Sequence, residues 1–268
     1  MRSNSLFLKT STILGFIFLY APIVSLIVFS FNESKLVTVW GGFSTKWYGE
    51  LFRDPQILGA AWISIKVAFL SATLAIIFGT IGAYVLVRFP RFRTKTLLSM
   101  MITAPLVMPE VIIGLSLLLM FVAMEGMIGW PEGRGLLTIV IAHSTFGAAY
   151  AAVVVQSRLV DMDMSIEEAA LDLGARPVRV FFDITLPVIA PALISGWLLA
   201  FTLSLDDLVV ASFVSGPGAS TLPMVIFSKV RLGVSPDVNA LATIIILLVS
   251  FGIIVAALQM GRSKKYAQ

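Results

Sequence analysis

The chain has 268 residues, of which 58% are hydrophobic and 13% are charged, and its formal net charge is +4. A soluble domain of this length needs a more polar surface than this charge content supplies, whereas a helix in lipid can be apolar on all sides. The chain contains no cysteine and one histidine, which excludes disulfides and thiolate metal sites and argues against a histidine-based metal site. The composition therefore indicates an integral membrane protein.

Six apolar stretches reach the roughly 20 residues that a helix needs to cross the hydrocarbon layer. They are residues 10–31, 59–87, 97–122, 136–156, 188–214 and 238–260. We interpret the first as a retained anchor, because it is longer than the apolar region of a secretory signal and no small-x-small cleavage site follows it. The sequence therefore predicts an all-α integral membrane protein with six transmembrane helices, forming one membrane domain over residues 1–268.

The distribution of lysine and arginine predicts the orientation of these spans. With the N-terminus inside the cell, the cytoplasmic segments hold twelve basic residues and the outer segments hold six. The strongest single contribution is the short loop 88–95, RFPRFRTK, between the second and third spans. Both termini are therefore expected to be cytoplasmic.

The largest cytoplasmic loop, residues 157–187, holds the most informative pattern. Ser165 followed by Glu168 forms a capping-box pattern, which predicts a helix that starts at Ser165. Gly174 suits the left-handed residue that ends such a helix, and Pro177 suits the first turn of a second short helix. Pro187 marks the entry to the fifth span. These residues predict a helix–turn–helix elbow, which by itself could equally be a connector that binds nothing.

The elbow resembles the EAA signature of type I ABC importer permeases in residue types, spacing and position between the fourth and fifth spans. The matching residues are Glu168, Ala169, Ala170, Gly174, Ile184, Leu186 and Pro187. The resemblance implies the fold of that family and a coupling loop that docks in a groove of an ATPase subunit. In that arrangement Glu168 would face a basic or donor group of the ATPase, Ala169 would allow close approach and Gly174 would make the bend.

The chain has no G-x-x-x-x-G-K-[ST] run, the phosphate-binding loop that ATPases of this kind use. We therefore expect a non-catalytic transport subunit without a cofactor or metal of its own, with ATP and Mg²⁺ bound by the partner ATPase.

Four ionisable side chains lie within the predicted spans, where such groups are costly and hence functional candidates. They are Lys66, Glu110, Asp206 and Asp207. Glu110 follows Pro105 and Pro109, which predict a broken or kinked third span. Three acids and one base give a net negative interior, which suits a cationic substrate. The alternative is that the acids pair with Lys66 or are protonated.

Long segments of the chain look like permease subunits of polyamine importers, and above all like putrescine permeases. Examples are ITAPLVMPEVIIGLSLLL, starting at Ile102, and AFTLSLDDLVVASF, starting at Ala200. The resemblance implies import of putrescine, or alternatively spermidine, from the periplasm across the bacterial inner membrane. It also implies as partners two copies of an ATPase, a second related permease and a periplasmic polyamine-binding protein, without nucleic acid.

Two alternatives stay open from the sequence. The chain could serve an ABC importer for another cationic or amino-acid-like solute, or it could be a secondary transporter that needs no ATPase. The only histidine, His143 in the fourth span, is expected to be a hydrogen-bonded packing residue.

Overall fold

The computed structural model describes residues 3–35, 39–89, 91–233 and 236–265, and within these ranges the side chains from Leu6 to Phe251. The regular elements of the described residues are helices, with one isolated bridge between Asn32 and Phe43. The chain forms two compact units. One consists of the segments Met1–Leu58 and Ile226–Gln268, and the other of Gly59–Val225. Compactness alone does not show independent folding, so the assignment of one membrane domain stays a prediction.

Five helices of the described residues are long and apolar enough to cross a membrane. They are α1 (Ser3–Phe29), α3 (Pro55–Arg88), α5 (Glu110–Ile128), α6 (Leu136–Asp161) and the helical run Pro177–Asp206. Each overlaps one of the predicted spans. The sixth predicted span, 238–260, falls in α12 (Pro236–Lys265), whose side chains beyond Phe251 lie outside the described residues. The sixth span therefore stays a prediction.

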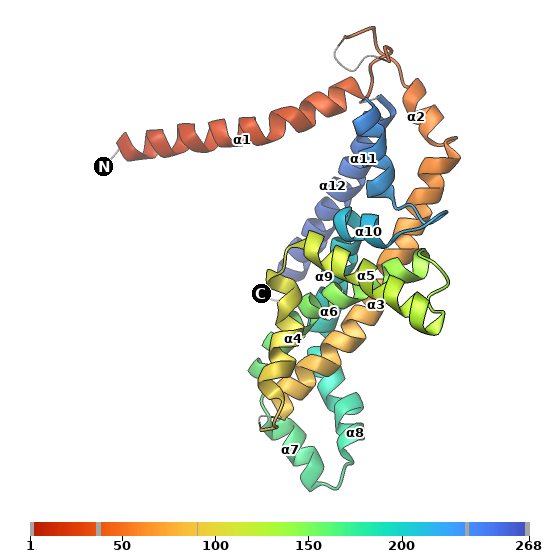
Figure 1. Ribbon diagram of the computed structural model, residues 1–268. Coiled ribbons are helices and arrows are strands. Elements are labelled where there is room, and N and C mark those ends of the chain that lie inside the picture. The colour runs from red at the N-terminus through yellow and green to blue at the C-terminus, as the bar shows by residue number, and fades with distance from the viewer. Residues whose placement is uncertain (1–2, 36–38, 90, 234–235, 266–268) are drawn as a thin grey trace. The chain divides into compact units, whose positions relative to one another are not determined.

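Two of the predicted spans contain a helix break (Figure 1). The third is divided into α4 (Lys95–Val107) and α5, with Met108 and Pro109 extended between them. This confirms the predicted break, because Pro109 donates no backbone N–H and disfavours a helical conformation at Met108. The fifth is divided into α9 (Leu186–Asp206) and α10 (Val209–Val214), with Asp207 extended at ψ 125°. The expectation of one continuous helix there was wrong.

Helix α6 forms the core of the Gly59–Val225 unit and packs closely against α3 and α9. A Cβ added to Gly79 of α3 would lie 2.8 Å from the carbonyl oxygen of Ala148. A Cβ on Gly196 of α9 would lie 3.6 Å from the Cα of Ala151. Small residues of this kind let helix backbones approach in a membrane, where van der Waals packing replaces the hydrophobic effect between helices. This packing fixes α3, α6 and α9 around the polar residues that they carry.

The other unit contains α1, α2 (Lys46–Leu51), α12 and the end of α11 (Leu222–Leu232). Trp47 of α2 is buried and only 5% exposed. Its indole N–H donates to the carbonyl oxygen of Asn32 at 2.6 Å, and the Tyr48 hydroxyl lies 2.7 Å from Ser30 Oγ. Buried aromatic donors need such partners. These two aromatics therefore tie α2 to the end of α1.

Candidate functional site

A cavity of about 460 Å³ brings together the three acidic residues that the sequence singled out. Glu110, Asp206 and Asp207 line it, together with Phe146 and Tyr150 of α6. Both helix breaks, at Pro109 and at Asp207, lie on its wall. Broken helices that present polar groups to a cavity are the usual form of a substrate site in transporters. Carboxylates and aromatic faces both attract an ammonium group, so the cavity is chemically suited to an organic cation.

Two of these acids are open to the cavity. Glu110 is the first residue of α5 and is exposed, and the positive end of that helix favours its negative charge. Asp206 is the last residue of α9 and is also exposed. These two residues are therefore free to meet a ligand.

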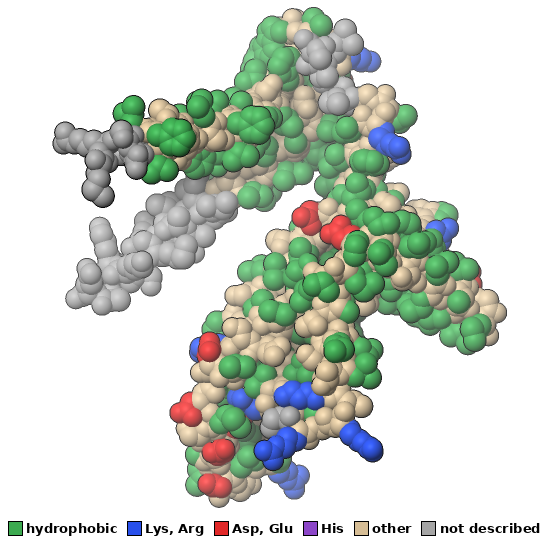
Figure 2. Space-filling model, turned by 60° about the vertical axis from the view of Figure 1, so that its left-hand side comes forward, with side chains coloured by type: hydrophobic (Ala, Val, Ile, Leu, Met, Phe, Trp, Pro, Cys, Tyr) green, Lys and Arg blue, Asp and Glu red, His purple; other side chains and the backbone are tan. Residues whose placement is uncertain are grey.

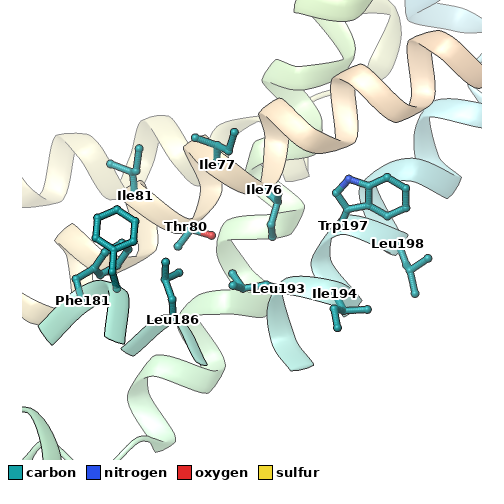
Figure 3. Close-up of a pocket in the computed structure, with 11 residues that line it drawn as sticks. Ile76, Ile77, Thr80, Ile81, Phe181, Leu186, Leu193, Ile194, Trp197 and Leu198 are labelled. Atoms are coloured by element: carbon teal, nitrogen blue, oxygen red, sulfur yellow. The ribbon is translucent and has the colours of Figure 1, made fainter. Parts of the chain in front are cut away.

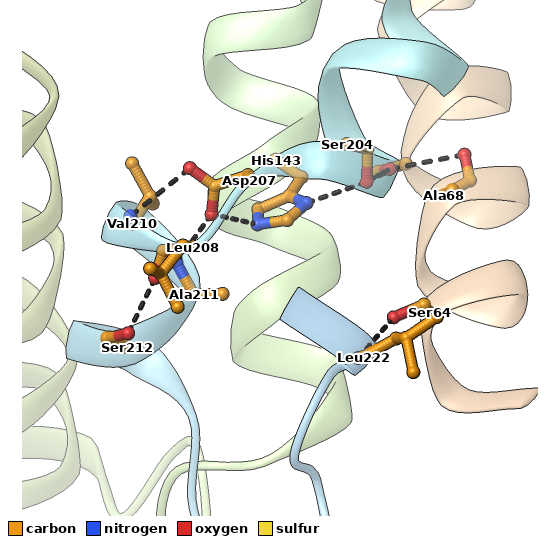
Figure 4. A network of polar contacts seen from close by, with 11 residues as sticks. Ser64, Ala68, His143, Ser204, Asp207, Leu208, Val210, Ala211, Ser212 and Leu222 are labelled. Atoms are coloured by element: carbon orange, nitrogen blue, oxygen red, sulfur yellow. Dashed lines mark hydrogen bonds and ion pairs between the residues drawn. The ribbon is translucent and has the colours of Figure 1, made fainter. Parts of the chain in front are cut away.

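The third acid, Asp207, is engaged by the protein itself (Figure 4). Its side chain is 6% exposed. Its Oδ2 accepts the backbone N–H of Ala211 at 2.7 Å and its Oδ1 accepts that of Val210 at 3.3 Å. These bonds satisfy donors in the first turn of α10, as a capping carboxylate does. Asp207 is thus built into the helix break.

His143 reaches the same carboxylate from α6. Its Nε2 lies 3.1 Å from Asp207 Oδ2, and its Nδ1 lies 2.6 Å from Ser204 Oγ. The residue is 1% exposed. The predicted hydrogen bonding of this histidine is thereby confirmed, but the sequence did not identify its partners.

In the part of the chain that the structure describes, Lys66 does not pair with the acidic residues of the cavity, as the alternative interpretation of the sequence expected. Among the described residues its ammonium forms no ion pair with Asp206 or Asp207, and it lies 5.0 Å from the ring centroid of Trp62. Lys66 is exposed on α3. The carboxylate of Asp207 is instead held by His143 and by backbone N–H groups.

The predicted elbow is formed by α7 (Ser165–Asp172) and α8 (Pro177–Val180). Gly174 follows α7 in the left-handed region at φ +86°. Its N–H donates to Leu171 O, and the Ala175 N–H donates to Ala170 O. This pair of bonds is the Schellman arrangement that ends many helices. Pro177 begins α8, so the predicted bend and the start of the second helix are both confirmed.

The predicted capping box at the start of the elbow is absent. Ser165 is the first helical residue, and its side chain makes no capping hydrogen bond with the helix. The carboxylate of Asp163 accepts the Ser165 N–H at 3.0 Å instead. Hydrogen bonds from the backbone and side chain of Ser165 hold the pKa of Asp163 below its usual value. The start of the helix was therefore predicted correctly, with the wrong residue as its cap.

The EAA-like residues divide into an exposed group and a packed group. Glu168, Ala169 and Gly174 are exposed on the elbow, and Ala170 is half-buried. Leu173, beside the bend, is 90% exposed. An exposed surface of small and apolar groups with one carboxylate suits a protein partner.

The remaining EAA-like residues lie at the start of α9 and in the stretch just before it. Helix α8 continues through a π-helical stretch, η1 (Phe181–Thr185), into α9 without a break in helical backbone. Ile184 and Leu186 are partly buried and pack against a buried cluster that includes Leu159 and Ile189 among its members. Pro187 is exposed in the first turn of α9, and its missing N–H fits the altered hydrogen bonding before it. The signature therefore links the elbow rigidly to a predicted span.

A buried ion pair that the sequence did not reveal anchors the elbow. Arg88, at the end of α3, lies 2.7 Å by its Nε from Glu167 Oε2, with side chains 6% and 9% exposed. Glu167 Oε1 also accepts the Thr185 hydroxyl at 2.6 Å, and Arg88 Nη1 donates to Leu159 O at 3.2 Å. These contacts join α3, α6, α7 and η1. From the sequence, Arg88 counted only as part of the basic loop 88–95, and no pattern pointed to Glu167 as its partner.

Charged side chains gather at the end of the Gly59–Val225 unit that carries α7 and α8 (Figure 2). The hydrophobic surface above them is interrupted by a small group of acidic side chains (Figure 2). This distribution separates a polar end from an apolar body.

A second cavity, of about 650 Å³, lies between α3 and the η1–α9 segment (Figure 3). Its lining is apolar apart from Thr80, whose buried hydroxyl has no hydrogen-bond partner among the described residues. Leu186 of the EAA-like signature lines it, with Ile77 and Trp197. Its chemistry gives no reason to place a polar substrate there.

Comparison with known proteins agrees with these features. The family described as "Binding-protein-dependent transport system inner membrane component" matches residues 75–264. The chain is 62% identical over 253 residues to the putrescine transport system permease protein PotI of Escherichia coli strain K12, covering 94% of this chain and 90% of that protein. It is 41% identical over 247 residues to the spermidine/putrescine transport system permease protein PotC of the same strain, covering 92% and 90%.

Solved structures show the same fold. A chain of a bacterial ABC transporter involved in the import of the acidic polysaccharide alginate superposes with a TM-score of 0.72 at 19% identity, covering 97% of this chain and 98% of that one. A chain of the MetNI methionine ABC transporter superposes with a TM-score of 0.59 at 16% identity, covering 82% and 99%. At these identities the likeness concerns the fold alone.

Proposed function

The chain belongs to the family of binding-protein-dependent transport system inner membrane components, and on that basis we propose that it is the permease subunit of an ATP-driven polyamine importer. Members of this family are transport components rather than catalysts. The observation that carries the substrate class is the likeness to a putrescine permease over nearly the full length of both chains. Putrescine is the first expected substrate, and spermidine the second. The protein is a multi-pass inner-membrane component.

The proposed topology has six transmembrane helices with both termini in the cytoplasm, all within one membrane domain. It is supported by five long apolar helices, by α12 at the position of the sixth and by the excess of lysine and arginine in the segments assigned to the cytoplasm. In this topology the elbow, α7 and α8, projects into the cytoplasm.

The elbow is the proposed dock for an ATPase subunit, which binds ATP and Mg²⁺. The exposed residues Glu168, Ala169 and Gly174 would make the contact, while Ile184 and Leu186 would pass its movement to α9 through their packing. The proposed complex holds two ATPase copies, a second related permease and a periplasmic polyamine-binding protein. Its permease itself needs no cofactor.

The cavity lined by Glu110, Asp206 and Asp207 is the proposed passage for the cation. A diamine carries two ammonium groups, so a wall with several carboxylates compensates both charges as the substrate leaves water. Phe146 and Tyr150 provide aromatic faces for the methylene chain and the ammonium groups.

Reconstitution of the complete complex in proteoliposomes tests this function. Uptake of labelled putrescine is expected to require the permease, the ATPase, ATP and the loaded binding protein together. Uptake that continues without ATP hydrolysis would contradict the importer class. ATP-dependent uptake of an amino acid without uptake of polyamines would contradict the proposed polyamine substrate and leave the importer class intact.

A further inference from the structure

One buried imidazole holds both sides of the break between α9 and α10. Ser204 lies in the last turn of α9, and Asp207 follows the end of that helix. His143 contacts both, through Nδ1 at 2.6 Å and Nε2 at 3.1 Å. Figure 4 shows the ring lying between the two side chains. Asp206, which lines the cavity, thus lies in the sequence between the two residues that this ring contacts.

The polar chain behind the ring continues to α3. Ser71 lies 3.0 Å by its Oγ from Ser204 Oγ, and Ser71, His143 and Ser204 are at most 5% exposed. Ser71 donates to Ser204 Oγ, and Ser204 can in turn donate to Nδ1. In that tautomer the ring N–H is at Nε2, which lies 3.1 Å from Asp207 Oδ2. Buried polar groups that lose such partners are costly, so the chain fixes the ring and the carboxylate in place.

We propose that His143 is a positioning residue of the cation passage: by joining Ser204 to Asp207 across the helix break, it fixes the direction in which the Asp206 carboxylate meets an alkylammonium ion. The inference rests on the proposed function, because it needs the cavity to be the passage. It assigns different roles to the neighbouring acids. Asp206 contacts the substrate, and Asp207 shapes the backbone that presents it.

The alternative is that the histidine only packs α6 against α9. The two ideas differ in how substitutions combine. If His143 acts through Asp206, its loss should matter little once the Asp206 charge has been removed. If His143 only packs the helices together, the fold-losses of uptake from the two substitutions should multiply.

A double-mutant cycle on the complete complex in proteoliposomes separates them, with putrescine uptake measured at saturating loaded binding protein. Asp206→Asn and His143→Phe are each expected to lower uptake by about tenfold or more. The double variant should fall no more than about twofold below Asp206→Asn alone. His143→Gln, whose amide nitrogen reaches the position of Nε2, should stay within about threefold of the parent protein.

Thr145→Val is the matched control, because Thr145 lies on the same helix and is exposed, and its hydroxyl bonds to its own helix at Ile141 O. It should leave uptake unchanged. If His143→Phe fails to assemble, Ser204→Ala removes one side of the link and takes its place in the cycle. Thermal unfolding of each purified complex checks assembly.

The positioning role would be overturned if the fold-losses of uptake in the two single variants multiply in the double variant. It would also be overturned if His143→Phe keeps normal uptake while Asp206→Asn is impaired. Either result leaves the acidic passage intact. Unchanged uptake in Asp206→Asn would overturn the acidic passage and the positioning role together.

Discussion

At the scale of single residues, acids with similar sequence surroundings have different roles. Asp206 and Asp207 are adjacent, yet Asp206 is open to the cavity and the Asp207 side chain is 6% exposed with backbone donors and His143 around it. The difference arises because α9 ends between them. A carboxylate just after a helix end can turn back to cap the next helix, and its neighbour then points elsewhere.

A second charged cluster, Lys229 with Asp54 and Asp237, gives a prediction of pH dependence. Lys229 Nζ lies 2.9 Å from Asp54 Oδ2 and 2.7 Å from Asp237 Oδ2. Burial raises the pKa of Asp54, but hydrogen bonds from Lys229 and the backbone of Ile57 and Gln56 outweigh it and hold the pKa below 3.8. Burial lowers the pKa of Lys229, but its bonds to Asp237 and Asp54 outweigh it and hold the pKa above 10.5.

The stabilisation from Asp54 is therefore present above pH 3.8 and is lost as the pH falls through its lowered pKa. That from Lys229 is present below pH 10.5 and is lost as the pH rises through its raised pKa. Lys229→Met should lower the free energy of unfolding by about 1 kcal/mol between these limits, because the side chains are partly exposed. Thermal unfolding in detergent across pH measures this, with the exposed Arg53→Met as control. A loss that is largest below pH 3.8 would contradict the assignment.

At the scale of elements, the elbow combines a docking surface with an anchor. Its exposed residues serve the proposed contact, whereas Glu167 ties it to α3 and η1. Adjacent glutamates thus belong to different interactions, which gives two separate predictions.

The first prediction concerns docking. Glu168→Lys should abolish ATP-driven uptake and co-purification of the ATPase without changing thermal unfolding, because the side chain is exposed. Gly174→Leu should also abolish uptake and co-purification, but with a loss of about 1–2 kcal/mol in stability, because a φ of +86° strains any residue that has a Cβ and the change distorts the bend. Asp161→Lys, an exposed charge reversal at the end of α6, is the control. Normal uptake by Glu168→Lys would rule out this dock.

The second prediction concerns the anchor. Glu167→Gln should lower the free energy of unfolding by about 3–5 kcal/mol, because it leaves the Arg88 charge buried without its partner. Thr185→Val, which removes one hydrogen bond, should cost about 1 kcal/mol. Glu168→Gln is the matched control on the neighbouring residue and should change it by less than about 0.5 kcal/mol. Equal effects of the two glutamine substitutions in thermal or denaturant unfolding would refute the anchor.

At the scale of the whole molecule, the topology decides on which side of the membrane each loop lies. The chain contains no cysteine, so one introduced cysteine reports a single position. Cysteine at Lys264 should react with an impermeant thiol reagent only from the cytoplasm, and cysteine at Lys46 only from outside. The physical reason is the larger number of basic residues near the segments assigned to the cytoplasm. Reaction of both positions from the same side would overturn the six-span arrangement.

The sequence by itself determined the features that depend on neighbouring residues. Apolar runs predicted the long helices, Pro109 predicted the break before α5, and Gly174 and Pro177 predicted the bend of the elbow. These features follow from hydropathy and backbone conformation, which act over a few residues. The EAA-like spacing also marked the elbow as functional, and its docking role stays a prediction.

The tertiary structure alone decided which distant groups meet. Arg88 and Glu167 pair across 79 residues of chain, and His143 and Ser204 across 61. The break at Asp207 has no proline beside it, and the cap of α7 comes from Asp163 rather than from the predicted Ser165 and Glu168 pair. Sequence patterns could not rank these partners, because a buried polar group bonds whichever donor or acceptor the packing of α3, α6 and α9 brings within reach.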